Sequence, residues 1–339
     1  MAYLLLENGM AFEGKRIGAQ KAAAGELVFT TGVVGYVENV TDPANAGKLV
    51  VQTFPVIGNY GVTEQDEESP CTPAGYVVRN LCETPSNFRS EMDLNAYLVK
   101  KGIPGLSGVD TRYLVKVLRN QGTMKAMIVD EVQKKPSFEE EKGNIPLCDG
   151  ALFPAKEEKA KGILWDLGAK KSLIDTLNQF GFSVERMPYT VKAEDILQKK
   201  PDALVISGGM EEAKDMDSLL PEMKKLLGKV PVLSVGLGHL LTAKALGGTV
   251  KKLPSGHRGQ NQPVFCTLDG LTSITCQNHA YAVEAESLSG MGKMIYYNLN
   301  DQSCEGMEYP SLSCITLQFD PDEQVLRHFA ARMGGEQDA

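Results

Sequence analysis

One stretch, residues 230–241, constrains the fold of this chain more than any other. It begins with an aliphatic run, Val230–Val235, continues through Gly236 and Gly238, and ends in an apolar segment with helical spacing. This pattern is typical of a strand–turn–helix elbow. Such elbows often hold a nucleophile above the edge of a sheet. The residue at the tip is Gly236, which has no side chain, so the sequence predicts an elbow without its usual chemistry.

The surrounding sequence alternates between strand-like and helix-like segments. Repeated units of this kind predict an α/β fold with a doubly wound, mostly parallel sheet, whose ligand sites lie at the carboxyl ends of the strands. The turn Ser207–Gly209 and the elbow are then expected side by side. We expect strands at 162–168, 183–187, 203–207 and 230–235, helices at 171–180, 194–199 and 219–227, shorter strands around 256–259, 274–279 and 312–319, and a helix at 323–333.

The beginning of the chain has a different character. Short β-prone runs separated by Gly, Pro, Asn and Asp predict a β-rich domain over residues 1–130. Residues 131–161 are rich in Lys and Glu, contain three prolines and show no period, so we interpret them as a linker before a second domain at 162–335. Within the first domain we expect strands at 3–6, 25–31, 48–54 and 75–78, and helices at 93–101 and 110–121.

Composition excludes several classes of protein. The formal net charge of −8 over 339 residues argues against a nucleic-acid or anionic-membrane partner. There is no basic amino-terminal segment and no run of the roughly 18 apolar residues that a membrane span needs, so we expect a cytoplasmic protein. The seven cysteines form no C-x-x-C pair and the four histidines no H-x-x-x-H pair. We therefore expect neither a metal site nor a cofactor.

Several motifs occur together in the order typical of one family. In the first domain they are Gly25–Phe29, Gly35–Tyr36, Thr41–Pro43, Pro55–Gly61, Gly108–Arg112 and Gly122–Lys125. In the second they are the elbow with Gly238–His239, Gly256–Asn261, Gln277–His279, Asn298–Asp301 and Glu305–Met307. The chain thus resembles the small, amidotransferase subunit of glutamine-dependent carbamoyl phosphate synthetase. The resemblance implies a β-rich amino-terminal domain, a class I glutamine amidotransferase domain, and a large ATP-dependent partner subunit that receives ammonia.

The resemblance also implies a catalytic triad, and this chain departs from it at each position. In the family a Cys on the elbow attacks the glutamine amide, a His serves as base and acid, and a Glu orients the His. The corresponding residues here are Gly236, Asp320 and Asp322. Two carboxylates cannot do the work of an imidazole and would repel a glutamate product. We therefore expect no glutaminase activity.

The glutamine pocket implied by the resemblance is only partly retained. Gly209, Leu237 and Asn278 match the family, and Ala280 and Tyr281 are mild changes. Three further positions are substituted: Gly32 replaces a Ser, Leu240 a Gln, and Glu211 a Gly. We expect the Glu211 side chain to fill space that the ligand needs.

Three functions remain open at this point. The first is a structural or regulatory partner of the large subunit, and the second is a module in which Glu211, Leu240, Asp320 and Asp322 bind a cationic or amine-bearing ligand. The third is a hydrolase that uses another residue, for which Ser234 is the candidate. We interpret Cys276 and Cys314 as core thiols, and His239, His257 and His279 as structural.

Overall fold

The chain forms two compact units, Met1–Asn144 and Ile145–Ala339. The computed structural model describes residues 1–132, 137–138, 147–148, 150–211 and 216–333. Much of the predicted linker, and the predicted end of the second domain at 335, lie outside these residues. Strand β8 (Leu152–Phe153) falls inside the stretch 131–161 that we expected to be a linker. Within the described ranges, no helix combines the length and apolar character that a bilayer crossing requires.

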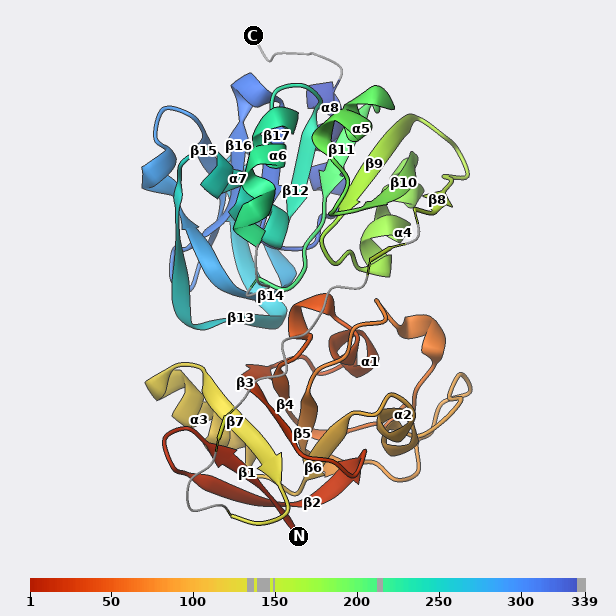
Figure 1. Cartoon of the computed structure of the whole chain (residues 1–339), viewed down its shortest axis with the longest axis vertical. Coiled ribbons are helices and arrows are strands. Elements are labelled where there is room, and N and C mark those ends of the chain that lie inside the picture. Colours follow the sequence, from red (N-terminus) through yellow and green to blue (C-terminus); the bar gives the residue numbers. More distant parts are fainter. Residues whose placement is uncertain (133–136, 139–146, 149, 212–215, 334–339) are drawn as a thin grey trace. The chain divides into compact units, whose positions relative to one another are not determined.

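The first unit is built around a closed barrel with strand order β1-β2-β6-β5-β4-β3-β7, in which β7 pairs with β1 (Figure 1). Its strands are β1 (Ala2–Leu6), β2 (Ala11–Gly18), β3 (Ala23–Thr30), β4 (Leu49–Ile57), β5 (Gly75–Leu81), β6 (Pro104–Ser107) and β7 (Met124–Val129). Its helices are α1 (Tyr36–Val40), α2 (Leu94–Lys100) and α3 (Thr111–Gln121). The predicted β-rich domain is confirmed, although the sequence reading did not include β2, β6 or β7.

Alternating side chains explain why residues 27–29 of β3 are apolar on both faces of the strand. Leu27 and Val28, neighbours on β3, are both fully buried but belong to different core clusters. The Leu27 cluster includes the apolar face of α3, and the Val28 cluster includes that of α2. Successive residues of a strand point to opposite faces, so a strand covered on both faces has no polar side. Asp93 and Asp110 cap the amino termini of α2 and α3, because their side chains accept hydrogen bonds from the backbone amides of Ala96 and Tyr113.

The second unit contains a mixed sheet with strand order β14-β13-β15-β16-β17-β12-β11-β9-β10-β8. Its strands are β8, β9 (Ala160–Asp166), β10 (Phe182–Pro188), β11 (Ala203–Ile206), β12 (Val232–Val235), β13 (Thr249–Cys266), β14 (Thr272–Glu284), β15 (Lys293–Asn298), β16 (Cys304–Tyr309) and β17 (Cys314–Leu317). Its helices are α4 (Lys171–Phe180), α5 (Ala193–Gln198), α6 (Leu220–Leu226), α7 (Leu237–Ala245) and α8 (Glu323–Met333). The predicted α/β fold is confirmed.

The sheet is less parallel than we expected. The pairs β10–β9, β9–β11, β11–β12 and β12–β17 are parallel, whereas both flanks of the sheet are antiparallel. The prediction of a mostly parallel sheet was wrong for these flanks, because only the βα repeats supply crossover helices and the later strands are joined without them.

The sheet is doubly wound as predicted. Ile163, Leu204 and Val232 pack in one core cluster with residues of α6 and α7, while Leu164 and Val205 pack in another with residues of α4 and α8. The central parallel strands are therefore buried on both faces, which explains their continuous apolar sequences. Because β12 lies between β11 and β17, the elbow that follows it opens at the middle of the sheet (Figure 1).

The antiparallel flank contains the long hairpin β13–β14, which the sequence reading divided into shorter strands. Its register shifts twice, between Lys252 and His257 and again between Gly259 and Gln262. Such irregularities interrupt the alternation of apolar and polar residues from which strands are predicted. Between the two shifts, His257 lies directly opposite His279.

Candidate functional site

The elbow has the geometry that the sequence predicted. Gly236 links β12 to α7 with φ 54° and ψ −114°, a backbone conformation that strongly favours glycine. Its amide donates a hydrogen bond to the carbonyl of Leu317 (2.7 Å), which ties the turn to β17. A Cβ atom at this position would lie 3.1 Å from the Cα of Gly208. The turn is therefore tightly enclosed, and no side chain projects from its tip.

The neighbouring turn after β11 lies at the same edge of the sheet. Gly236 and the residues after Ile206 follow adjacent parallel strands, as the register of β11 and β12 requires. A Cβ atom on Gly209 would lie 1.9 Å from the carbonyl oxygen of Leu167, so only glycine fits there. The Ser207 hydroxyl accepts a hydrogen bond from the Leu167 amide (2.8 Å). Gly209 is thus required by the packing of the loop after β11 against the loop after β9, whether or not a ligand binds.

Glu211 reaches across this edge and binds the hairpin. Its Oε2 accepts a hydrogen bond from the backbone amide of Ala280 (2.6 Å), and its Oε1 accepts one from Nε2 of Gln318 (3.0 Å). Ala280 is one of the expected pocket positions, whereas Gln318 was not among them. The Glu211 carboxylate therefore links the turn after β11 to β14 and to the end of β17.

Asp320 and Asp322, the two acidic replacements, have separate roles. Asp320 forms an ion pair with Lys170, with 2.6 Å between Nζ and Oδ2. Asp322 is exposed and accepts a hydrogen bond from the amide of Val325 (2.9 Å), the third residue of α8. An acidic residue in this place caps a helix. The two carboxylates are thus engaged by a cation and by a helix terminus.

The other pocket positions lie on α7 and β14. Leu237 is 3% exposed and Leu240 is 4% exposed, and both belong to the core cluster beneath α7. On β14, Asn278 Oδ1 accepts a hydrogen bond from Arg258 (2.8 Å), and Ala280 is buried. Tyr281 lies partly exposed on the same strand. Leu240 is therefore a core side chain in this structure.

Gly32 belongs to the first unit and lies in the loop after β3. Its amide donates to Oγ1 of Thr30 (3.3 Å) and its carbonyl accepts from Nε2 of Gln52 (3.2 Å). A Cβ atom at Gly32 would make only ordinary contacts, the nearest to the carbonyl oxygen of Val34 at 3.4 Å. The backbone would therefore accept a serine, and its conformation does not require the glycine.

The candidate substitute nucleophiles are poorly placed for chemistry. Ser234 is fully buried under α7, 2.9 Å from the Thr242 hydroxyl. His239 is also fully buried, and burial lowers its pKa to about 3, so it is neutral near pH 7. Cys314 is buried as expected, whereas Cys276 is exposed on β14. The interpretation of Cys276 as a core thiol was wrong, because its side chain points to the outer face of the hairpin.

Two residues of this edge were not identified from the sequence, namely Lys170 and Gln318. Lys170 lies immediately before α4 and pairs with Asp320, and Gln318 lies immediately after β17 and holds Glu211. The signal that could have identified them is their position just beyond the carboxyl end of a parallel strand, where such sheets place their sites.

Comparison with known proteins agrees with this two-part organisation. Residues 4–128 match the family model of the carbamoyl-phosphate synthase small chain, and residues 163–331 match that of class-I glutamine amidotransferases. The carbamoyl phosphate synthase small chain of Clostridium perfringens is 39% identical over 329 residues, covering 95% of this chain and 94% of the relative. That of Caldanaerobacter subterraneus is 40% identical, covering 94% and 90%.

A third relative, the pyrimidine-specific small chain of Bacillus subtilis, is 37% identical and covers 94% of this chain and 90% of its own length. Both domain models and these nearly full-length similarities agree with the division into a barrel unit and a doubly wound unit. The chain belongs to the family of carbamoyl phosphate synthase small chains.

Proposed function

We propose that this chain is a small subunit of carbamoyl phosphate synthase that has lost glutaminase activity and acts as a structural or regulatory partner of the large subunit. Ammonia for carbamoyl phosphate synthesis would then come from solution or from another amidotransferase. The observation that carries the proposal is the elbow: Gly236 has no side chain at the position where the family resemblance places the nucleophile.

The residues around the elbow support the loss of chemistry. Amide hydrolysis through a covalent intermediate needs a nucleophile and a base that accepts and returns its proton. The position expected for the base holds Asp320, which is paired with Lys170, and the position expected for the orienting group holds Asp322, which caps α8. Removal of triad members in a hydrolase leaves only the residual rate supplied by binding and oxyanion stabilisation.

Glu211 supports the loss of substrate binding. Its carboxylate accepts hydrogen bonds from Ala280 and Gln318, so an incoming amino-acid carboxylate would have to displace it and overcome repulsion between like charges. A carboxylate tethered to the protein competes with a free ligand at a high effective concentration, because little entropy is lost when it binds. We infer that the pocket is filled by the chain itself.

The same contacts weigh against a module that binds a cationic ligand. Such a ligand would need acidic groups with unsatisfied charge. Glu211, Asp320 and Asp322 are each engaged by donors of the protein, and Leu240 lies in the core. The partner role is therefore the function that the site supports best.

The experiment combines three measurements on the purified full-length chain: ammonia release, covalent labelling and co-purification with the large subunit. Release of ammonia from glutamine is measured alone and with the large subunit, and labelling by an electrophilic glutamine analogue is followed by mass spectrometry. A small chain with a cysteine at the elbow is the positive control. We expect no ammonia above background, no label at residues 230–241, and stable co-purification with the large subunit.

Two results would contradict separate parts of the proposal. Glutamine hydrolysis at a rate close to that of the positive control would exclude the loss of activity. Failure to associate with the large subunit, with the chain shown to be folded by circular dichroism, would exclude the partner role.

A further inference from the structure

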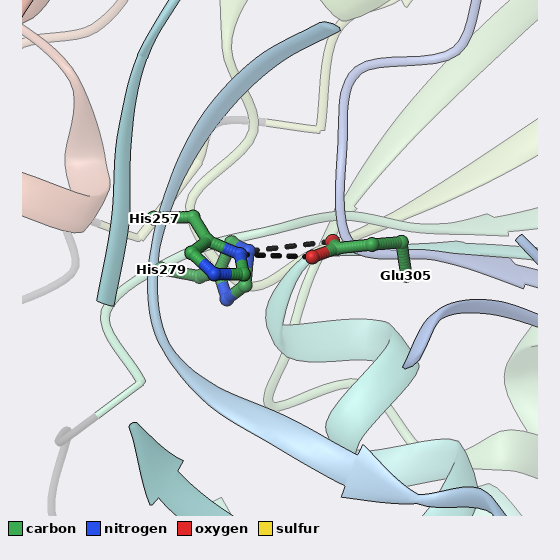
Figure 2. Close-up of side chains that lie close together, drawn as sticks. All are labelled: His257, His279 and Glu305. Atoms are coloured by element: carbon green, nitrogen blue, oxygen red, sulfur yellow. Dashed lines mark hydrogen bonds and ion pairs between the residues drawn. The ribbon is translucent and has the colours of Figure 1, made fainter. Parts of the chain in front are cut away.

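His257, His279 and Glu305 form a cluster in the second unit that the proposed function does not use. His257 lies on β13, His279 opposite it on β14, and Glu305 on β16 (Figure 2). Nδ1 of His257 lies 2.8 Å from Oε1 of Glu305, and Nε2 of His279 lies 3.4 Å from Oε2. Figure 2 shows both rings facing the same carboxylate. The three ligand atoms all lie within 4.8 Å of one another.

The cluster is buried. The side chains of Glu305, His279 and His257 are 0%, 2% and 11% exposed. Within the described ranges, Oε2 of Glu305 is a buried atom with no hydrogen bond of acceptable geometry. An ionised carboxylate that is buried to this extent requires a compensating cation.

The other nitrogen of each ring is also directed at an acceptor. Nε2 of His257 lies 3.0 Å from Oδ2 of Asp301, and Nδ1 of His279 lies 2.9 Å from the carbonyl oxygen of Tyr281. A neutral imidazole has one N–H. If each neutral ring donates its N–H to its outer acceptor, its other nitrogen presents a lone pair to Glu305. Two lone pairs that face a carboxylate repel that carboxylate. Two neutral amides also lie beside the inner nitrogens, Asn298 Nδ2 at 3.3 Å from His257 Nδ1 and Gln277 Oε1 at 3.2 Å from His279 Nε2. Neither amide carries a positive charge, so a second proton on each ring or a cation between the rings is needed to balance the carboxylate.

This arrangement is the one that metal-binding histidines adopt. A histidine ligand usually donates its second N–H to a carboxylate or a backbone carbonyl, which orients the ring and fixes its tautomer. Asp301 and the Tyr281 carbonyl supply one acceptor of each kind. Ligands bound to one tetrahedral ion at about 2.0–2.1 Å lie roughly 3.3 Å apart. The nitrogen–oxygen separations of 2.8 and 3.4 Å span that value.

We propose that His257, His279 and Glu305 bind one divalent transition-metal ion of the zinc class, through Nδ1, Nε2 and the carboxylate. Two imidazoles and one carboxylate are a common donor set for such ions, and Asp301 holds the outer nitrogen of His257. Asp301 is 42% exposed, which gives the ion a route from solvent. The histidine spacing rule did not reveal this site, because the rule describes one helix and these histidines come from paired strands.

The site would support the hairpin next to the altered pocket. The carbonyl of Glu305 accepts a hydrogen bond from the amide of Gln318 (2.8 Å), whose side chain holds Glu211. His279 lies between Asn278 and Ala280 on β14. The ion would therefore fix the strands that carry the pocket's backbone donors. This role does not depend on whether the chain hydrolyses glutamine.

The test uses zinc and cobalt as probes on the full-length wild-type chain. The protein is stripped with a chelator and equilibrated with Zn²⁺ at micromolar free concentration, and bound metal is measured by mass spectrometry. We expect one ion per chain and an anomalous-scattering peak between His257, His279 and Glu305 in crystals. With Co²⁺ we expect the visible bands of a site of low coordination number, without the ultraviolet charge-transfer band that a cysteine ligand produces.

Variants separate the site from adventitious binding. Glu305→Gln keeps the size of the side chain and removes its charge, so we expect loss of stoichiometric binding. Asp301→Asn should weaken affinity about 10- to 100-fold, the usual effect of changing an outer partner. The matched control is His328→Gln, because His328 contacts Glu308, a buried carboxylate that already has Lys293 and Arg332 as cations. This variant should bind metal like the wild type.

The wild-type protein alone can overturn the proposal. Absence of bound Zn²⁺ at micromolar free concentration, or an anomalous peak elsewhere, would mean that protons on the two rings balance Glu305. Binding that Glu305→Gln leaves unchanged, or a cobalt spectrum with thiolate bands, would assign the ion to another site.

Discussion

Substitution of Gly236 by alanine tests the strain stored in the elbow. The backbone there has φ 54° and ψ −114°, where an L-residue costs about 1–3 kcal/mol. The new Cβ would also lie 3.1 Å from the Cα of Gly208, so the two turns must separate by a few tenths of an ångström. Replacing glycine also reduces the conformational entropy of the unfolded chain, which stabilises the folded state by about 0.4–1 kcal/mol. We therefore expect Gly236→Ala to lower the free energy of unfolding by about 1–3 kcal/mol.

A second variant and a control make this prediction specific. Gly236→Cys should cost about the same as Gly236→Ala, and it should remain inactive because no imidazole lies at Asp320. Gly247→Ala is the matched control: Gly247 ends α7 with φ 88° and has no atom within 4 Å of its Cβ position, so this variant measures strain without the contact. It should cost less than Gly236→Ala.

Stability is measured by urea unfolding monitored by circular dichroism, and activity is measured as the release of ammonia from glutamine. In a unit of this size 1 kcal/mol corresponds to about 2–4 °C in melting temperature. A Gly236→Ala variant as stable as the wild type would refute the strained elbow. Rapid glutamine hydrolysis by Gly236→Cys would refute the claim that the site also lacks its base.

Three further predictions concern other parts of the second unit. Glu211→Ala should lower the free energy of unfolding by about 1–2 kcal/mol, because water replaces its two hydrogen bonds only in part. Glutamine should raise the melting temperature of this variant but not that of the wild type. Equal shifts in the two proteins would contradict a pocket filled by Glu211. Gly209→Ala should lower the free energy of unfolding, measured by chemical unfolding, by about 3 kcal/mol or more, because its Cβ would lie 1.9 Å from a backbone oxygen. A stability close to that of the wild type would be inconsistent with this contact. Glu308, whose pKa the adjacent His328 imidazole (3.3 Å) and its neighbouring cations lower to about 2, contributes stability above pH ~4.5 that is lost as the pH falls toward 2. Unfolding measured across this range should show Glu308→Gln less stable by about 2–3 kcal/mol at pH 7 and less sensitive to acid, and parallel pH profiles for the two proteins would argue against that role.

Elements with one strong local signal were predicted well from the sequence. The continuous apolar runs at 203–207 and 230–235 became β11 and β12, and the helix predicted at 323–333 has those bounds. The hairpin β13–β14 and the closure of the barrel were predicted poorly. Both depend on pairing between distant residues, and the register of such pairs is not encoded in any one segment.

In the candidate site too, local features were predicted from the sequence and contacts between distant residues were not. Gly236 at the tip of the elbow was predicted from the residues themselves, and the expectation that Glu211 fills space is consistent with its two contacts. The departure from a triad was inferred from the family resemblance and stays a prediction. The partners of Asp320, Glu211 and His257 could not be predicted from the sequence. Lys170, Gln318 and the pairing of His257 with His279 come from different strands, so only the folded chain brings them together.

The most direct test of the proposed loss of activity is carbamoyl phosphate synthesis by the chain reconstituted with its large subunit, with glutamine and ammonium supplied in parallel assays. We expect ammonium to support synthesis and glutamine to give no more than the rate of the large subunit alone. Synthesis that proceeds with glutamine as readily as with ammonium would contradict the account, because it would require a nucleophile that the elbow at Gly236 does not hold.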